Sequence, residues 1–491
     1  MTDMTETGSY RVAADVGSSC IRVGLGNVLP DGRLELLAVE QAPVSSEVRH
    51  GKVQKVSEVG DLLASLLERL QHNPAYPCRV ERVLAGVNAY TMRTVLSHVT
   101  TVDLEQDEVT EALLENLKQE AIDKALPENK ECLDCFEQDF AVDGYHTRTP
   151  LHERPSRLEG QYKLLVCQRA VTDNLESAFE QAGVADYRHC ASLLATADAL
   201  LTPDDRKRGV VLVDFGAQTT GMCIIKDEVV SHVAVLPFGG DNLVQDLQLL
   251  DLTPDEARTR LLEQGDALHY TELMQMDGDA GNPRAFPAGD KAFNETVVAR
   301  IEEIVENIWA QIRYSGIAPN RLGGGIVMTG GLSQLPHLDV LLKQKTNLTA
   351  RMGQPDNRLS ADTNVAYTRP EYACLIGLLL KAEPGGCTVQ EKPREPEVKV
   401  VTETLFADEE PVQPVQKPRK SHGLFGTKPS REPQPQQPVR HEASPAPTPG
   451  PAGRPADRQE SKSKLTELSN LFGRLFDDNL ENEKSADEAA E

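Results

Sequence analysis

The chain of 491 residues carries 76 acidic and 51 basic side chains, which give a formal net charge of -25. A chain this long exceeds the size at which one hydrophobic core stops growing, so two or more domains are expected. The negative charge argues against a general nucleic-acid-binding protein, because neutralising phosphates requires a basic surface. The sequence has no run of about 18 apolar residues, so any membrane contact is expected to be peripheral.

The cysteines and the N-terminal sequence bear on the cellular compartment. The nine cysteines lie at irregular positions, which does not indicate a disulfide framework. The chain starts with the polar sequence MTDMTETGSY and not with a charged and then apolar leader. Together these features predict a reduced, cytoplasmic protein.

Strands and helices alternate in the first part of the chain. An apolar strand over residues 11–15 stops at a Gly/Ser turn, and a second strand over 21–25 leads to the hairpin sequence Leu29-Pro30-Asp31-Gly32. The patterns that follow predict a strand over 34–39, a helix over 62–70, a strand over 83–87, and helices over 107–125 and 175–182 before the segment 190–201.

The same order of strand, Gly-containing turn, strand, turn and strand recurs later, with strands over 209–213, 222–225 and 229–235. A long helix over 296–312 places seven aliphatic side chains on one side, and a buried-type strand over 323–329 follows it. A weak internal repeat of this kind predicts two similar α/β lobes.

Both strand-ending turns have the composition of a phosphate-binding site. The first is Asp15-Val16-Gly17-Ser18-Ser19, and the second is Asp214-Phe215-Gly216-Ala217-Gln218-Thr219. Glycine lets the backbone approach an anion closely, and the N–H groups that follow can face it. Either turn alone is a weak motif, but its recurrence after an apolar strand is much stronger. The predicted contacts with nucleotide phosphates are Asp15, Gly17, Ser18, Ser19, Asp214, Gly216, Gln218 and Thr219.

Charged side chains extend this prediction. A carboxylate does not favourably contact phosphate oxygens, so Asp15 and Asp214 are expected to hold the waters of a bound Mg²⁺. Arg22, on the strand after the first turn, can donate to a phosphate, or else it is a solvated strand residue.

A third glycine-containing turn follows the strand that ends at Thr329. Gly330, Gly331 and Leu332 lie between this strand and a helix start. Backbone without side chains there can lie flat against an adenosine, and the N–H groups that follow can face phosphate. The alternative is an ordinary tight turn from strand to helix.

The C-terminal region changes composition near Gly385. Residues 391–462 contain 14 of the 31 prolines, which predicts a disordered linker over 386–462. An amphipathic helix is predicted over 463–477, before an acidic disordered tail over 478–491. Its apolar stripe predicts binding to a membrane surface, with a protein groove or the protein's own core as alternatives. The stripe consists of Leu465, Leu468, Leu471, Phe472, Leu475 and Phe476.

The order of first phosphate turn, second phosphate turn and adenosine turn resembles the superfamily of actin, Hsp70 and sugar kinases. Within it the chain is similar to the FtsA family of bacterial cell-division proteins over residues 9–385. The segments that carry this likeness are Leu29–Gly32, Pro237–Asn242, Tyr372–Leu379, and the stretch from Gln138 to Val166, which resembles the 1C subdomain of FtsA.

The resemblance implies a two-lobed, actin-like (ribonuclease H-like) α/β fold that binds ATP and Mg²⁺. The first lobe is expected over 9–86 and 165–205, the 1C-type insertion over 87–164, the second lobe over 206–245 and 320–385, and a 2B-type subdomain over 246–319. The resemblance also implies protofilaments of the protein itself, binding of FtsZ, binding of other division proteins through the insertion, and tethering to the cytoplasmic face of the inner membrane at the septum. Nucleic acid is not an expected partner.

Two departures from the family pattern affect the expected activity. Ala217, Gln218 and Gly221 stand where the pattern has two glycines and a trailing acid, so at most weak ATP hydrolysis is expected. Arg258 and Leu261 stand where many FtsA proteins place Glu and Lys near the adenosine. The alternatives to an FtsA-type protein are a metabolic kinase of the same superfamily and another actin-like scaffold of a pilus or of cell shape.

Overall fold

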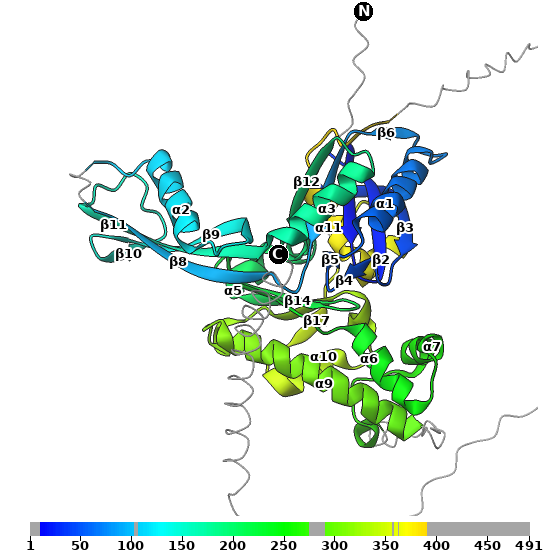
Figure 1. Cartoon of the computed structure of the whole chain (residues 1–491). Helices are drawn as coiled ribbons and strands as arrows, with labels where there is room; N and C mark the ends of the chain where they lie inside the picture. Colours follow the sequence, from blue (N-terminus) through cyan, green and yellow to red (C-terminus); the bar gives the residue numbers. More distant parts are fainter. Residues whose placement is uncertain (1–9, 103–106, 274–289, 356–357, 362, 390–491) are drawn as a thin grey trace, which may run out of the picture. The chain divides into compact units, whose positions relative to one another are not determined.

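The computed structural model describes residues 10–102, 107–273, 290–355, 358–361 and 363–389 (Figure 1). Two β-sheets of five and nine strands organise this part of the chain. The predicted amphipathic helix and acidic tail lie outside the described residues, as do the six side chains of the apolar stripe and residues 390–462 of the predicted linker. Residues 386–389 of that linker are described and include a strand over Cys387–Val389, so regular structure continues past the predicted start of the linker. Within the described ranges, no helix is both long and apolar enough to span a membrane.

The five-stranded sheet forms the first lobe. Its strand order is β12 (Asp186–Ala191), β7 (Arg82–Val87), β1 (Tyr10–Val16), β2 (Cys20–Val28) and β3 (Leu34–Pro43). The first three run parallel, and β1, β2 and β3 are joined by hairpins. Helices α1 (Val56–Gln71) and α3 (Arg169–Gln181) pack together beside this sheet, whereas α11 (Ala373–Lys381) packs on β1, β2 and β7.

The second lobe repeats this arrangement. In the nine-stranded sheet the order is β17 (Ala350–Met352), β16 (Gly325–Thr329), β13 (Val210–Phe215), β14 (Thr220–Lys226) and β15 (Val229–Leu236). The first three of these strands are again parallel, and the last three are again joined by hairpins. The predicted repeat is therefore confirmed at the level of sheet order. Helix α4 (Ser192–Leu200) contacts strands of both sheets, and α5 (Pro203–Arg208) leads into β13.

An inserted unit extends the second sheet. The strands β8 (Arg93–Val102), β11 (Arg157–Gln168), β9 (Lys130–Val142) and β10 (Tyr145–Thr147) continue it from β15, where Arg93 pairs with Ala234. Helix α2 (Glu111–Ala125) covers this part of the sheet (Figure 1). The helix begins later than the predicted residue 107, because the Thr110 hydroxyl caps its first turn by accepting from the Leu113 N–H at 3.2 Å.

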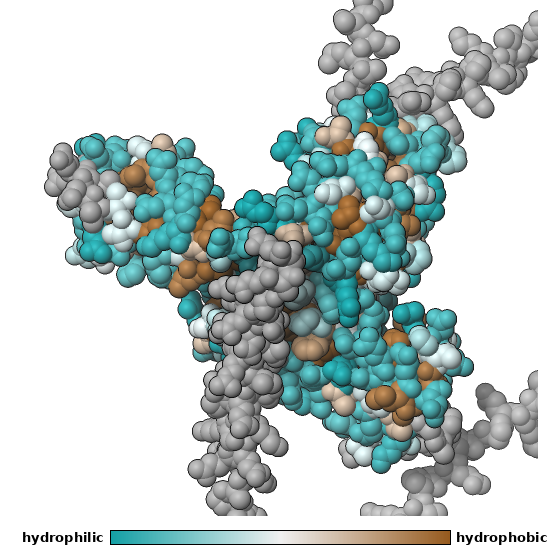
Figure 2. Space-filling model, in the orientation of Figure 1, coloured by the Kyte–Doolittle hydropathy of each residue, from teal (hydrophilic) through white to brown (hydrophobic). Residues whose placement is uncertain are grey.

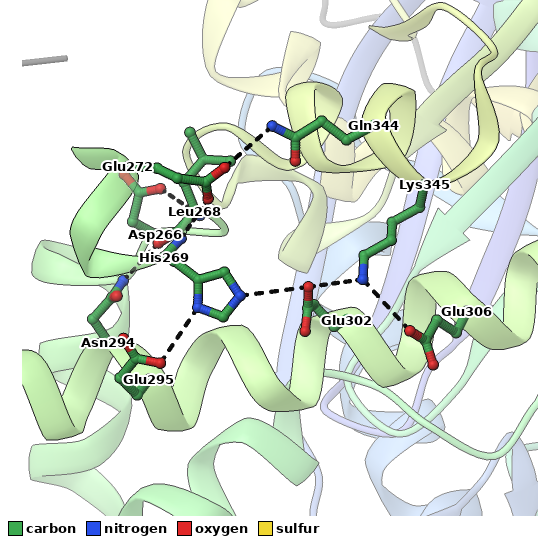
Figure 3. A network of polar contacts seen from close by, with 10 residues as sticks. All are labelled: Asp266, Leu268, His269, Glu272, Asn294, Glu295, Glu302, Glu306, Gln344 and Lys345. Carbon is green, nitrogen blue, oxygen red and sulfur yellow. Dashed lines mark hydrogen bonds and ion pairs between the residues drawn. The ribbon is translucent and has the colours of Figure 1, made fainter. Parts of the chain in front are cut away.

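The long helix α9 (Asp290–Tyr314) belongs to the second lobe with α6 (Gly240–Leu247), α7 (Pro254–Gln264) and α10 (Leu338–Thr346). The seven aliphatic side chains whose spacing predicts this helix are all buried: Val297, Val298, Ile301, Ile304, Val305, Ile308 and Ile312. On its polar side, Figure 3 shows the His269 ring between Glu295 (3.3 Å) and Glu302 (3.6 Å). The Lys345 ammonium of α10 lies 2.8 Å from Glu302. Apolar packing and ion pairs therefore both hold α10 on α9.

Shorter elements complete the described chain. A small hairpin joins β4 (Val48–Arg49) and β5 (Lys52–Val53), and β18 (Cys387–Val389) pairs with β6 (Cys78–Val80). Five 3₁₀ turns are described: η1 (Gln248–Leu250), η2 (Pro319–Arg321), η3 (Gly331–Gln334), η4 (Val365–Thr368) and η5 (Pro370–Tyr372).

Candidate nucleotide-binding site

The two predicted phosphate turns have the same backbone geometry. In the first, the Gly17 N–H donates to the Cys20 carbonyl at 3.1 Å. In the second, the Gly216 N–H donates to the Thr219 carbonyl at 2.9 Å. Each turn directly follows the end of a strand that is paired in parallel with a neighbour. This strand is β1 in the first lobe and β13 in the second. Such strand ends are where ligands bind in open α/β sheets.

Both glycines lie close to the carbonyl that closes their turn. A Cβ atom on Gly17 would lie 3.0 Å from the Cys20 oxygen, and one on Gly216 would lie 2.8 Å from the Thr219 oxygen. A larger residue at either place would push the turn open. The sequence pattern therefore reflects a steric requirement shared by both turns.

The acids Asp15 and Asp214 lie deep in the site, one on each central strand. Burial raises the pKa of Asp15, and the positive charge of Arg22 opposes that rise. Burial, followed by the negative charge of Asp15, raises the pKa of Asp214 to about 7. The two carboxyl groups are therefore close enough to repel each other when both are ionised. A bound cation would relieve that repulsion.

Arg22 faces the first turn and is not a solvated strand residue. It pairs with Asp15 in the antiparallel register of β1 and β2, and its Nη1 lies 3.7 Å from the Asp15 carboxylate. Its guanidinium also lies over the Tyr372 ring, 5.3 Å from the centroid. The Nε atom is buried without a hydrogen-bond partner among the described residues. Arg22 thus retains a donor for an additional acceptor at this place.

The third predicted turn lies against the second. Gly330 has a φ of 86°, and a Cβ atom there would lie 2.4 Å from the Asp214 carboxylate and 2.5 Å from the Phe215 carbonyl. Gly331 is different, because no atom lies within 4 Å of a Cβ built on it. Leu332 packs partly against the core of the second lobe. One glycine therefore permits close packing, and the next leaves an open surface.

Backbone N–H groups at the start of α6 donate hydrogen bonds to the second turn. The Gly240 N–H donates to the Gly216 carbonyl at 3.0 Å, and the Asp241 N–H donates to the Ala217 carbonyl at 2.7 Å. This support explains why Pro237–Asn242 accompanies the second turn in the sequence pattern. The turn is held by a helix N-terminus as well as by its own strand.

Three residues at this site were missed by the sequence analysis. The His50 ring and backbone both contact Gln218, and the Gly51 N–H donates to the Ser18 hydroxyl. The Cys374 thiol donates to the Asp15 carboxylate at 3.4 Å. The His50-Gly51 pair between two short strand-like segments indicates a turn, but no neighbouring residue indicates which distant turn it contacts.

Comparison with known proteins gives the family. The family described as "Cell division protein FtsA" matches residues 211–377, and the "SHS2 domain inserted in FTSA" matches residues 93–166. The chain is 26% identical to the cell division protein FtsA of Pseudomonas aeruginosa over 384 residues, which cover 76% of this chain and 89% of that one. The FtsA of Neisseria meningitidis is 24% identical, with 77% and 91% covered. The chain belongs to the FtsA family.

The inserted unit of this FtsA-family protein is the SHS2 domain, since its matched range contains β8, β9, β10 and nearly all of β11. The fold is also similar to that of a solved PilM–PilN type IV pilus biogenesis complex, with a TM-score of 0.52 and 14% identity over 76% of this chain and 98% of that one. The actin-like, two-lobed α/β fold predicted from the sequence is therefore confirmed. The same comparisons make the protein a cell-division protein of the actin-like class.

The two positions in α7 that depart from the FtsA pattern have different environments. Arg258 is half exposed, and its guanidinium lies 3.8 Å from Asp241 at the start of α6. Leu261 is buried in the core of the second lobe. Arg258 therefore reaches toward the support of the second turn, whereas Leu261 stabilises the packing of α7.

The residues of this site fit a magnesium nucleotide. The turns present backbone N–H groups after Gly17 and Gly216, Arg22 has an unused donor, and the two acids repel each other unless a cation is near. Among the described residues, no group of three or more His, Cys, Asp or Glu side chains is arranged to hold a metal ion. A magnesium ion here would need water and phosphate oxygens as its remaining ligands.

Proposed function

We propose that this FtsA-family protein binds ATP with Mg²⁺ between its two phosphate turns. The observation that carries the proposal is the equal geometry of the Gly17 and Gly216 turns, which end the central strands of two lobes with the same sheet order. Two N–H-rich turns with an acid beside each form a binding site for phosphates and a hydrated cation.

Each residue of the site has a specific role in this proposal. The N–H groups of Ser18 and Ser19 and the guanidinium of Arg22 bind phosphate from the first lobe, and Thr219 and Gln218 face it from the second. Asp15 and Asp214 hold waters of the magnesium ion, while Gly330, Gly331 and Leu332 border the adenosine. Gly221 stands where the family pattern has an acid that places metal or water. Slow hydrolysis at most is therefore expected, and the nucleotide acts mainly as a switch for assembly.

We further propose that the protein assembles on the cytoplasmic face of the inner membrane and tethers FtsZ filaments to it at the septum. Membership of the FtsA family supports this role. The subdomain over residues 246–319 would bind FtsZ, and the SHS2 domain would bind other division proteins. Six large apolar side chains on one stripe, at about 0.8 kcal/mol per buried methylene, suffice to hold a helix among lipid headgroups.

Liposome sedimentation tests the tether directly. The full chain and a chain cut after Lys462 are each mixed with vesicles of anionic or neutral lipid, with ATP and Mg²⁺ or without nucleotide. We expect only the full chain to sediment, and FtsZ filaments to sediment with it. If the full chain stays in the supernatant with every lipid, the tether proposal fails.

A matched pair of substitutions separates apolar insertion from charge. Leu471→Glu places a negative charge in the apolar stripe, whereas Asn470→Glu places the same charge on the opposite side of the helix. We expect the first variant to lose vesicle binding and the second to lose much less. Equal losses would indicate that net charge alone governs binding.

A further inference from the structure

The turn between β4 and β5 in the first lobe contacts the second phosphate turn. The His50 N–H donates to the side-chain oxygen of Gln218 at 3.0 Å. The His50 Nδ1 atom lies 3.0 Å from the backbone oxygen of the same residue. Two hydrogen bonds therefore join residues that are far apart in sequence and belong to different lobes. We call this pair the interlobe contact.

The same small turn also contacts the first phosphate turn. The Gly51 N–H donates to the Ser18 hydroxyl oxygen at 3.0 Å. The amides of two consecutive residues, His50 and Gly51, are therefore each bonded to a different phosphate turn.

The turn that carries these amides is rigidly placed in the first lobe. His50 and Gly51 both have positive φ angles, 47° and 78°, as in the type I′ turns of two-residue hairpins. A Cβ atom on Gly51 would lie 1.8 Å from the Asn88 oxygen, so only glycine fits there. The His50 carbonyl also accepts from the Tyr90 N–H at 3.1 Å. Movement of this turn would require movement of the surrounding lobe.

On the other side, Gln218 is held by its own lobe. Its side-chain nitrogen donates to the Asp241 carboxylate at 3.2 Å, and the Asp241 N–H donates to the Ala217 carbonyl. Both ends of the Gln218 amide are thus in use. Glycine, which the family pattern has at this position, has no side chain and can bond neither to the His50 N–H nor to Asp241.

We infer that Gln218 is a positioning residue that holds the two phosphate turns at a fixed spacing before nucleotide arrives, and that it slows nucleotide exchange. This rests on the proposed function, because the nucleotide is assumed to bind between these turns. Phosphates that enter or leave between the turns require them to separate, and separation breaks both bonds of the interlobe contact. With glycine at residue 218, the two lobes separate without breaking a bond between the His50 N–H and a side chain.

Two variants and one control test the inference. Gln218→Gly removes the side-chain acceptor of the His50 N–H, whereas His50→Phe keeps a ring against Tyr90 but loses the Nδ1 bond. Gln54→Gly makes the same change as the first variant at an exposed residue just after β5. We expect release of a fluorescent ATP analogue to be about tenfold faster for Gln218→Gly, since one hydrogen bond is worth about that factor. His50→Phe should speed release by a smaller factor, and Gln54→Gly should leave it unchanged.

Hydrogen exchange in the nucleotide-free protein provides a readout that does not depend on nucleotide binding. We expect the His50 amide to be protected in the original protein and in Gln54→Gly, and to exchange quickly in Gln218→Gly. The Gly51 amide keeps its Ser18 acceptor and should stay protected in all three. Unchanged His50 protection in Gln218→Gly would overturn the inference. Failure of the original protein to bind the ATP analogue, with His50 protection still dependent on Gln218, would instead overturn the nucleotide proposal and the effect on exchange, and would leave the positioning role of Gln218.

Discussion

The two phosphate turns share a backbone but differ in charge. Both close with a glycine N–H bonded to a carbonyl three residues later, and both lie at the end of a central parallel strand. In the pairing of β1 with β2, Arg22 lies opposite Asp15. In the pairing of β13 with β14, Gly221 lies opposite Asp214. The same place in the repeat thus holds a cation in one lobe and no side chain in the other.

This difference explains why the two acids have different environments. The charge of Arg22 lowers the pKa of Asp15 against the effect of burial. Gly221 lies opposite Asp214 on the neighbouring strand; burial and then the charge of Asp15 raise the pKa of Asp214 to about 7, although Arg22 lowers it to a smaller extent. A Cβ atom on Gly221 would lie 2.8 Å from the Leu193 side chain, so a larger residue there would require that side chain to move. The fold repeats the shape of the turn, and side chains give each turn its charge.

Replacing Arg22 should have the largest effect. Arg22→Gly makes the first turn resemble the second, and we expect ATP affinity to fall by about 50-fold, because a charged hydrogen bond is worth about 1.5–3 kcal/mol. Titration with a fluorescent ATP analogue at pH 8 measures this. Arg22→Lys should recover part of the affinity, and Arg33→Gly, at the far end of the same hairpin, should change little. Equal affinities for Arg22→Gly and the original protein would show that the turns do not differ in phosphate binding.

The second turn should make the binding of ATP with Mg²⁺ depend on pH. In the proposed site, magnesium is held by the ionised form of Asp214, whose pKa burial raises to about 7. Raising the pH from 6 to 8 ionises this carboxyl, so we expect affinity for ATP with Mg²⁺ to rise by about tenfold. Calorimetry at both pH values measures the change. Asp214→Asn should flatten the profile, and a profile that stays steep in this variant would assign the proton to another group.

The stability of the nucleotide-free protein should depend on pH in the opposite direction from its affinity for ATP. Because folding raises the pKa of Asp214 above its ordinary value of 3.8, the folded state holds a proton that the unfolded state has lost between these pH values. The contribution of Asp214 to stability is therefore fully present below about pH 4 and is lost as the pH rises through 7. Urea unfolding of the original protein and Asp214→Asn at pH 5 and pH 8 compares them. The difference between the two proteins should change between these pH values; a constant difference would contradict the shift.

Local patterns in the sequence predicted the repeat and the turns. Apolar strands that stop at Asp-x-Gly are visible without a structure, and the seven aliphatic side chains of α9 show the spacing of one helix face. Family resemblance supplied the inserted domain, because the alternation of its strand β11 indicates a strand but not the domain to which it belongs. The repeat predicted two similar lobes, but not the order of the strands within their sheets.

Contacts between distant segments were not predictable in the same way. The sequence pattern does not single out His50, and it predicts its partner Gln218 as a phosphate contact and not as a partner of the first lobe. The bond between Cys374 and Asp15 likewise joins residues from opposite ends of the actin-like domain. Such contacts depend on how the whole chain packs, and one sequence contains no local signal for them.

The smallest expected effect concerns the residues after the two glycines. Ser19 and Gln218 occupy the same place in the repeat, and Ser19 is exposed whereas Gln218 is bonded to His50 and Asp241. Ser19→Ala removes a hydroxyl but keeps the backbone N–H, so we expect ATP affinity to fall by only about threefold. Ser46→Ala, at another exposed serine of the first lobe, serves as the control in the same titration. A loss as large as that of Arg22→Gly would mean that the first turn binds phosphate mainly through the Ser19 side chain, and its likeness to the second turn would then be one of shape alone.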